Sequence, residues 1–478
     1  MKRLAWGICV LVGCGGPGGA VVDAGAEGGD AGVPDAITVD GPSGDIVSID
    51  LDPLVLTPSF SPTVHDYAVR CSAGDNVVTL TYTDQTGTHA SVVHLAEDQE
   101  LDVGDYWIRC LPHDFPHVVT TAHGAATPGY YLLTSATFAI VLDPNGVPVW
   151  YERGTNVVDL ESPAHDVVSF VPNASPPYGW NAAATFGIHA LDTLTTTPLA
   201  TVGVPTDFHE HLALPGGHYL VTAYPIESHV DLTGLGTFGS DNAMADCEVE
   251  ELDASDQLVW SWLASAHVDA VKESIEPQVN TINGQSVVDT FHCNSIEVDG
   301  SGNLLLSFRH TNSLYYVDKT TGAVQWKLGG TSFNKDGATY VQVTSDPETT
   351  FNMQHDARFL PNGDVTMFDD HGADGGKSGE VARGVEYAID HVANTATVVF
   401  QYLGIGEASW TGSFRRYADG DSLVGWGYVS KDPRIATEID AAGNDVLDIT
   451  SDGGGNYRAL KVPLSQLDIA VLRATTAK

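Results

Sequence analysis

The chain has 478 residues, of which 43% are hydrophobic, so it is long enough to form more than one domain around a sizeable core. Its 62 acidic and 21 basic side chains give a formal net charge of −41. This charge argues against a nucleic-acid partner and against general attraction to anionic lipid, and an anionic substrate would need a locally positive site.

The first fourteen residues, MKRLAWGICVLVGC, have the pattern of an export signal. A basic start precedes an apolar run that is too short for a permanent membrane span. The run ends in LVGC, which resembles the bacterial lipobox, so residues 1–14 are predicted to be a lipoprotein signal with Cys14 lipidated. The alternative is a plain secretory signal. We expect an exported lipoprotein in the periplasm or at the outer membrane or cell surface of a bacterium, with the lipid as its only membrane anchor.

Two short regions precede the main part of the chain. Residues 15–45 are rich in Gly, Ala and Asp and contain no basic residue, which is typical of a disordered tether. Residues 46–115 alternate short apolar strands with turns and predict a small β-sandwich module, similar to cadherin-like modules. Cys71 and Cys110 lie in this module, where a disulfide is plausible outside the cytoplasm. Cys247 and Cys293 are expected to be buried thiols, although the sequence leaves their pairing open.

Residues 116–478 repeat a four-stranded pattern. One half is a strand pair around a turn, as in LPGGHYLVTA. The other half is a strand ending in Asp, a turn and a strand that often carries Trp, as in FAIVLDPNGVPVWYE. The repeated aspartates are Asp143, Asp192, Asp253, Asp318, Asp390 and Asp440. Six units without linkers predict an all-β fold in which residues 116–478 form a six-bladed β-propeller.

Three histidines occupy the same position in successive units. His209, His292 and His355 each lie seven residues before the turn of the first strand pair. The first strand of a propeller blade lines the central channel, so we expect these side chains to converge there. Asn294 lies two residues after His292 and would share its strand face. In FNMQHDARFL, His355 is expected in the middle of a strand.

Arg309, in LLLSFRHTN, is expected in the following strand among apolar residues. A cation there needs either an anionic ligand or an ion pair with Asp369 or Asp370. Zinc would suit three histidines but not a neighbouring arginine. A tetrahedral oxyanion suits the guanidinium fork, and a neutral imidazole can attack sulfur or phosphorus. The pattern therefore predicts transfer of a sulfuryl or phosphoryl group with no metal and no cofactor.

Most of residues 117–450 resembles the bacterial aryl-sulfate sulfotransferases, six-bladed propellers that pass a sulfuryl group between phenols. The resemblance rests on HCNSIEVDGSGNLLLSFRH, WKLGG, NMQHDARFLPNGDVTMFDDHG and ARGVEYAID. It implies a PAPS-independent, ping-pong transfer from a phenolic sulfate ester to a phenol, with His355 forming a sulfohistidine. It also implies that His292, Asn294, Arg309 and His209 hold the sulfate, with His292 or His209 acting as acid or base.

Two features depart from the family pattern. The segment TSFNKDGATYVQVTSDPETTF lacks the cysteine pair that some members carry there, and Gly384 stands where a larger residue is common. The phenol-binding residues are not evident, although Trp426 and Tyr428 are candidates.

Two other functions stay open at this point. One is a metal-dependent propeller hydrolase, such as a lactonase, that would use the histidines with Glu210, Asp356 or Asp369. The other is a non-catalytic surface propeller that binds partners. The sequence does not identify the donor, the acceptor or the oligomeric state, for which a homodimer is one option.

Overall fold

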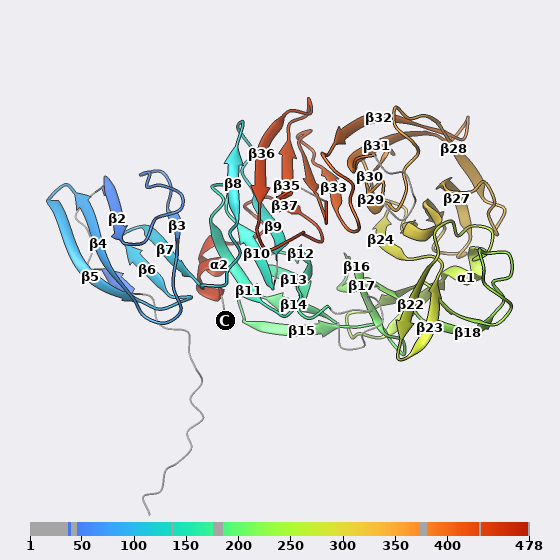
Figure 1. The fold of residues 1–478 in the computed structure, drawn as a ribbon, viewed down its shortest axis with the longest axis horizontal. Helices are drawn as coiled ribbons and strands as arrows, with labels where there is room; N and C mark the ends of the chain where they lie inside the picture. Colours follow the sequence, from blue (N-terminus) through green and yellow to red (C-terminus); the bar gives the residue numbers. More distant parts are fainter. Residues whose placement is uncertain are drawn as a thin grey trace, which may run out of the picture.

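A computed structural model describes residues 37–39, 45–135, 137–174, 185–372, 380–429 and 432–476. The predicted signal with Cys14, and most of the predicted tether, lie outside these residues. The described part contains 37 strands and two short helices, α1 (Ala264–His267) and α2 (Ile469–Thr475), so the predicted all-β class is confirmed (Figure 1). Among the described residues, no helix has both the length and the apolar character needed to cross a bilayer.

The first strands form two sheets that share a core. They are β1 (Ile37–Val39), β2 (Ser48–Asp52), β3 (Asp66–Arg70), β4 (Asn76–Asp84), β5 (Gly87–Leu95), β6 (Glu100–Val103) and β7 (Tyr106–Leu111). One sheet has the order β1-β6-β7-β3 and the other β2-β4-β5. Leu51, Leu80 and Leu101 belong to one buried cluster with side chains from both sheets. Cys71 and Cys110 form the disulfide that the sequence suggested.

Among the described residues, the strands that follow include three four-stranded sheets, one nine-stranded sheet and one five-stranded sheet, and these contain six groups of four strands, called units here. Five consist of strands close together in sequence, and the sixth combines β9–β11 with the distant strand β37. Unit by unit, beginning with the one that contains β37, the strands are β9 (Tyr130–Ser135), β10 (Phe138–Leu142), β11 (Pro148–Arg153), β37 (Leu460–Val462); β12 (Val158–Ala164), β13 (Val167–Val171), β14 (Phe186–Ala190), β15 (Thr195–Leu199); β16 (Thr206–Leu214), β17 (His218–Ala223), β20 (Glu248–Leu252), β21 (Leu258–Leu263); β24 (Cys293–Val298), β25 (Leu304–Phe308), β26 (Ser313–Val317), β27 (Val324–Gly329); β29 (His355–Phe359), β30 (Val365–Asp369), β31 (Arg383–Asp390), β32 (Thr395–Leu403); β33 (Ser413–Arg416), β34 (Ser422–Gly425), β35 (Arg434–Ile439) and β36 (Asp445–Thr450).

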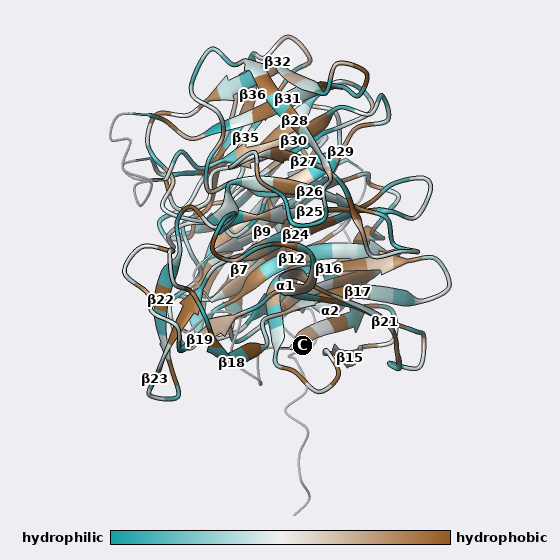
Figure 2. Ribbon diagram, turned by 90° about the vertical axis from the view of Figure 1, so that its right-hand side faces the viewer, coloured by the Kyte–Doolittle hydropathy of each residue, from teal (hydrophilic) through white to brown (hydrophobic). Residues whose placement is uncertain are grey.

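Six further strands extend or join these units. β8 (Val119–Ala122) pairs with β36, and β28 (Thr339–Ser345) links β27 to β32. A separate sheet contains β18 (Ile226–Val230), β19 (Asn242–Ala245), β23 (Gln285–Asp289) and β22 (Gln278–Ile282). This sheet is built from the segments that follow β17 and β21, and it lies at one side of the molecule in both views (Figures 1 and 2).

The repeated aspartates lie in the turns between the last two strands of a unit. Asp143 Oδ1 accepts hydrogen bonds from the backbone N–H groups of Asn145 and Val147, at 2.9 and 2.7 Å. Asp253 and Asp440 accept equivalent pairs of backbone hydrogen bonds. Aspartate is favoured in such turns because its carboxylate satisfies the backbone donors. The repeat is therefore visible in the sequence because one turn chemistry recurs.

The first strands of neighbouring units lie side by side. β12 contacts β16, β16 contacts β24, β24 contacts β29, and β29 contacts β33. Buried apolar residues fill the space between adjacent units; one cluster joins Leu305 and Leu328 to Met367 and Val385. In the hydropathy colouring, hydrophobic and hydrophilic stretches alternate along many of the strands (Figure 2). Residues at the ends of the first strands are therefore placed to meet residues of other units.

Both departures from the family pattern have a structural explanation. The segment without the cysteine pair is tied down by Asp346, which accepts hydrogen bonds from Arg383 Nη1 at 2.8 Å and from the Tyr387 hydroxyl at 2.5 Å. Gly384 packs so closely against the Phe414 ring that a side chain there would collide with it.

Candidate active site

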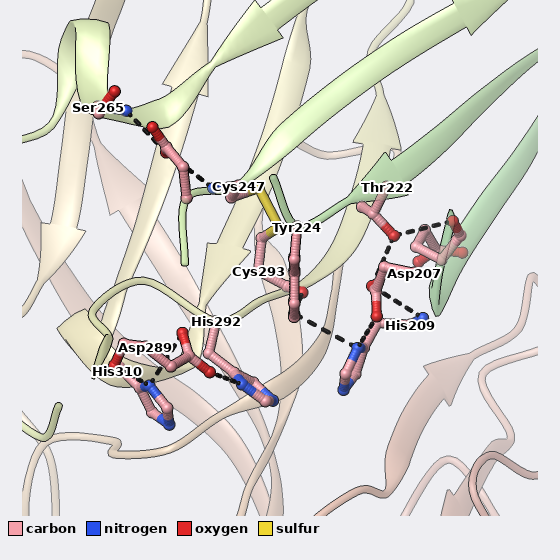
Figure 3. Close-up of a disulfide and its surroundings, with 12 residues drawn as sticks. Asp207, His209, Thr222, Tyr224, Cys247, Ser265, Asp289, His292, Cys293 and His310 are labelled. Atoms are coloured by element: carbon pink, nitrogen blue, oxygen red, sulfur yellow. Dashed lines mark hydrogen bonds and ion pairs between the residues drawn. A yellow bond between two sulfur atoms is a disulfide. The ribbon is translucent and has the colours of Figure 1, made fainter. Parts of the chain in front are cut away.

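His209, His292, Arg309 and His355 lie close together at one end of the first strands. His209 lies in β16, His292 directly precedes β24, and His355 is the first residue of β29. The rings of His209 and His292 meet edge to face with centroids 4.8 Å apart (Figure 3). Burial lowers the pKa of His355 well below its usual value, and the charges of Arg309, His209 and His292 lower it further. The structure thus brings the four predicted residues into one electrostatic environment.

Irregular strand pairing directs these side chains inward. The register of β24 against β25 shifts beside Cys293, and that of β29 against β30 shifts beside His355. His292 and Met353 have left-handed backbone conformations, with φ of 51° and 52°. Bulges of this kind re-aim side chains and are common next to active sites. The expectation that His355 lies in mid-strand is wrong, because the irregular backbone before it delays the start of β29.

Two of the histidines are held by buried aspartates. His209 Nδ1 donates to Asp207 Oδ1 at 2.7 Å, and His292 Nδ1 donates to Asp289 Oδ2 at 2.6 Å. A neutral imidazole that donates through Nδ1 has its lone pair on Nε2. Burial lowers the pKa of His292 to about 3, so its ring is neutral near pH 7. Each ring can therefore accept a proton at Nε2.

The two aspartates were missed by sequence reasoning. Asp207 lies two residues before His209, and Asp289 lies three residues before His292, so each precedes its histidine closely. Burial alone would raise the pKa of Asp289, but His310 and His292 hold it well below its usual range. A carboxylate two or three residues before each of these two histidines was the signal available in the sequence.

His355 faces a third aspartate. Its Nδ1 lies 3.2 Å from Asp370 Oδ2, although the two groups are not aligned for a hydrogen bond. Burial raises the pKa of Asp370 well above its usual value, against the opposing charge of Arg309. One proton can therefore lie on either member of this pair. When it lies on Nδ1, the Nε2 lone pair of His355 is available for bonding.

Arg309 is a buried cation with a spare donor. It begins a 3-10 turn directly after β25, so the expectation of a strand residue is wrong; the backbone turns back because Asn312 is left-handed, with φ of 50°. Its Nη2 donates to the Ser409 carbonyl at 3.1 Å, and its Nη1 donates to His310 Nε2 at 3.2 Å. Its Nε lies 4.0 Å from Asp370 and has no hydrogen-bond partner among the described residues. Such a guanidinium is suited to bind an anion.

Asn294 supports the site from β24. It is fully buried, and its amide nitrogen donates to the Gln354 carbonyl at 2.7 Å. Gln354 directly precedes His355, so this hydrogen bond fixes the backbone that presents the imidazole. A role for Asn294 in holding sulfate oxygens stays a prediction.

A second buried group of charges lies beside the histidines and is called here the Arg458 cluster; it contains Arg358, Arg415, Arg458, Asp159, Glu210 and Asp356. Arg458 donates to Asp159 at 2.8 Å, to Glu210 at 3.1 Å and to the His209 carbonyl at 2.8 Å. Arg415 binds Asp356 through two hydrogen bonds of 2.7 and 2.6 Å. Sequence reasoning missed Arg458 because it lies outside the histidine pattern.

The carboxylates considered for a metal-dependent hydrolase are bound by arginines. Glu210 and Asp356 belong to the Arg458 cluster, and Asp369 accepts a hydrogen bond from Arg383 Nε at 3.0 Å. Within the described residues, two groups have the spacing of metal ligands: Asp289, His292 and His310; and Asp159, Glu161 and Glu210. The first adjoins Arg309 and the second surrounds Arg458. A metal ion would thus add positive charge beside a guanidinium in either group.

Cys247 and Cys293 form a disulfide, so the expectation of two buried thiols is wrong (Figure 3). The fold brings their Cα atoms to 6.1 Å although 46 residues separate them in sequence. Cys293 follows His292, and its carbonyl accepts a hydrogen bond from the Tyr224 hydroxyl, which lies 3.3 Å from His209 Nδ1. The disulfide therefore fixes backbone that adjoins two of the histidines.

The two candidate phenol-binding residues have opposite surroundings. Trp426 is fully buried, and its Nε1 donates to Thr437 Oγ1 at 2.8 Å, so it is a core residue. Tyr428 is 43% exposed.

One known protein family is similar to this chain in sequence. A sequence model of the arylsulfotransferases (ASST) matches residues 184–452. No curated protein matches the chain. A solved structure of a protein of unknown function from Bacteroides caccae is 11% identical, with a TM-score of 0.41, over 70% of this chain and 99% of that chain. The structure of U3-55K is 8% identical, with a TM-score of 0.35, over 85% of this chain and 100% of that chain. The sequence match spans more than half of the chain, including all three histidines and Arg309, and the protein belongs to the arylsulfotransferase family.

Proposed function

We propose that this protein moves a sulfuryl group from a phenolic sulfate ester to a phenol, with His355 as the carrier. Family membership indicates a sulfotransferase in general. The observation that carries the proposal is the buried Arg309, whose Nε has no partner in the described part of the chain, beside His355 and two histidines with Nδ1 bound to aspartates. The Arg309 guanidinium supplies a cation that an anionic substrate would need in a chain of net charge −41.

In the first half-reaction, Nε2 of His355 attacks the sulfur of the aryl sulfate. The N–S bond forms while the bond between sulfur and the phenolic oxygen breaks, which yields a sulfohistidine and a free phenol. The phenolic oxygen leaves as a phenolate and takes a proton from the solvent. Arg309 stabilises the charge on the sulfuryl oxygens.

In the second half-reaction, the acceptor phenol gives its proton to Nε2 of His209 or His292, and its oxygen attacks the sulfur of the sulfohistidine. The N–S bond breaks and His355 is regenerated. The histidine then releases this proton to the solvent, which supplies one to the leaving phenolate, so the cycle has no net proton change. Both substrates are phenols or their esters, so this ping-pong scheme uses no PAPS and no other cofactor.

We further infer that the six four-stranded units close into a six-bladed β-propeller with the histidines at its channel. The support is the order of contacts between the first strands and the pairing of β37 with β9, which joins distant parts of the chain. We also propose export and lipidation at Cys14. Two disulfides favour an oxidising compartment.

The direct test is incubation of the full chain with a chromogenic aryl sulfate, with and without an added phenol. Release that depends on the phenol supports the transferase, whereas equal release without it would indicate a sulfatase. After incubation with the donor alone, mass spectrometry should find a sulfuryl group on the peptide that contains His355. A sulfuryl group on another residue, or none during normal turnover, would contradict the carrier role.

A further inference from the structure

We infer that Trp410 and Tyr428 form one surface on which the aryl groups of both donor and acceptor bind, an inference that rests on the proposed sulfuryl transfer. Trp410 is 53% exposed and Tyr428 is 43% exposed. Their ring centroids lie 5.5 Å apart with an interplanar angle of 53°. The exposed large aromatic residues of the described part are these two and Phe333, so aromatic exposure is concentrated at this pair.

Backbone hydrogen bonds place the pair next to Arg309. Ser409, which precedes Trp410, offers its carbonyl to Arg309 Nη2 at 3.1 Å. The Ser409 N–H donates to the Tyr428 carbonyl at 3.1 Å, and the Tyr428 N–H donates to the Trp410 carbonyl at 3.2 Å. The segment before β33 and the segment after β34 are thus paired where they meet the guanidinium. Trp410 was missed by sequence reasoning because it lies outside the repeated strands.

The other side of the pair leads to His209. A Cβ added to Gly455 would lie 2.8 Å from Tyr428 Cγ, so the tyrosine ring packs directly on this glycine backbone. Two residues further along, Tyr457 is buried, and its ring centroid lies 6.1 Å from that of His209. Tyr428 therefore lies between the segment that binds Arg309 and the segment that reaches His209.

The proposed chemistry requires only one aryl position. The leaving oxygen of the donor and the attacking oxygen of the acceptor both occupy the side of sulfur that faces away from His355. Both aryl rings therefore extend from the sulfur in the same direction. There they can pack on the tilted Trp410 and Tyr428 rings. A chain of net charge −41 disfavours further anionic groups on either substrate. We therefore expect the substrates to be flat phenols that carry no additional negative charge.

The binding test does not depend on turnover. An aryl sulfonate has a carbon–sulfur bond and cannot be transferred, so its affinity for the full chain can be measured by calorimetry and compared with that of an alkyl sulfonate of similar size. We expect the unsubstituted protein to prefer naphthalenesulfonate over hexanesulfonate. Trp410→Ala and Tyr428→Ala should each reduce this preference roughly tenfold. Phe333→Ala, the matched exposed aromatic residue, should leave it unchanged.

The kinetic test separates this inference from the proposed function. In ping-pong kinetics, kcat/KM for the donor and kcat/KM for the acceptor report separate half-reactions. Both values should fall in Trp410→Ala and in Tyr428→Ala. Normal values in both variants, or a change for one substrate only, would overturn the shared surface while leaving sulfuryl transfer intact. If Trp410→Ala and Tyr428→Ala lose the aryl preference while the unsubstituted protein transfers no sulfuryl group, the shared surface is upheld and the proposed reaction is refuted.

Discussion

The histidine site and the Arg458 cluster are neighbouring groups of buried charges built largely on the same strands, but their bonding differs. Arg458 is surrounded by Asp159, Glu161, Glu210 and Asp356, and none of its donors is unpartnered among the described residues. Arg309 has one carboxylate nearby, Asp370, at 4.0 Å, and its Nε has no hydrogen-bond partner in the same part of the chain. A saturated buried cation holds strands together, whereas one with spare bonding capacity can hold a ligand.

The largest expected effect is on the histidine side of this comparison. His355→Ala should lower the rate of aryl-sulfate turnover by about 10⁴-fold, because the variant has no group to carry the sulfuryl unit. The free energy of unfolding should change by less than about 1 kcal/mol, since His355 Nδ1 makes no hydrogen bond in the described structure. A chromogenic assay and urea unfolding measure the two quantities. His218→Ala, in a histidine outside the site, is the control; comparable activity in His355→Ala would refute the carrier.

Arg458→Met tests the Arg458 cluster, the second of the two regions compared. It should lower the free energy of unfolding by about 3–5 kcal/mol, because Asp159, Glu210 and Asp356 would lose a common partner while remaining buried. Urea unfolding measures the loss, and Lys272→Met, in a surface pair 3.7 Å from Asp269, is the matched control with an effect under about 1 kcal/mol. A loss as small as that of the control would mean that the Arg458 cluster does not hold the strands.

Removal of the Cys247–Cys293 disulfide should affect both stability and transfer. Opening a loop of this separation, 46 residues, should lower the free energy of unfolding by about 2–4 kcal/mol. Transfer should also slow, because the bond restrains the backbone beside His292. The paired variant Cys247→Ser with Cys293→Ser is compared with Cys71→Ser with Cys110→Ser, which should leave transfer unchanged. Equal transfer rates in the two paired variants would mean that the Cys247–Cys293 disulfide does not influence the histidine site.

Asp289→Asn sharpens the assignment of acid and base. The amide cannot accept the His292 Nδ1 proton as a carboxylate does, so the imidazole loses its fixed orientation, and kcat/KM should fall by about 10²-fold. Steady-state kinetics measure the effect, with the exposed turn variant Asp253→Asn as control. If Asp289→Asn is as active as this control, His292 does not take part in proton transfer.

The smallest effect is a pH dependence of stability. The pKa of His292 is about 3 in the folded chain and near 6.5 when unfolded, so the unfolded chain binds more protons between these values. Stability should therefore decrease as pH falls below 6.5, by at most about 1.4 kcal/mol per pH unit for this residue. Urea unfolding between pH 7 and 5 should show a shallower decrease in His292→Gln. Parallel profiles for the two proteins would mean that the imidazole is not kept neutral by the fold.

The strands and the aligned histidines could be predicted because they repeat. The same aspartate turn recurs at Asp143, Asp253 and Asp440, and His209, His292 and His355 hold one position in the repeat. The backbone conformation at the site could not be predicted, because bulges beside Cys293 and His355 depend on pairing with a second strand. A strand pattern likewise gave no sign that Arg309 starts a 3-10 turn.

Contacts between residues that are distant in the chain could not be predicted from the sequence either. Asp159 and Arg458 are 299 positions apart, and nothing local to either residue indicates the other. Cys247 and Cys293 become partners only when two units pack together. Trp426 and Tyr428 are separated by one residue, yet one lies in the core and the other at the surface. Burial at this point is decided by neighbouring segments rather than by residue type.

The pairing of β37 with β9 has a consequence for biosynthesis. Residues 457–462 supply Tyr457, Arg458 and β37, which contact His209 and complete the sheet that began with β9. A nascent chain that has not been made as far as residue 462 has most of the fold's strands but cannot yet bring these partners to the histidines. Prematurely terminated chains should therefore be catalytically silent, and appearance of activity would mark the completion of translation through this segment.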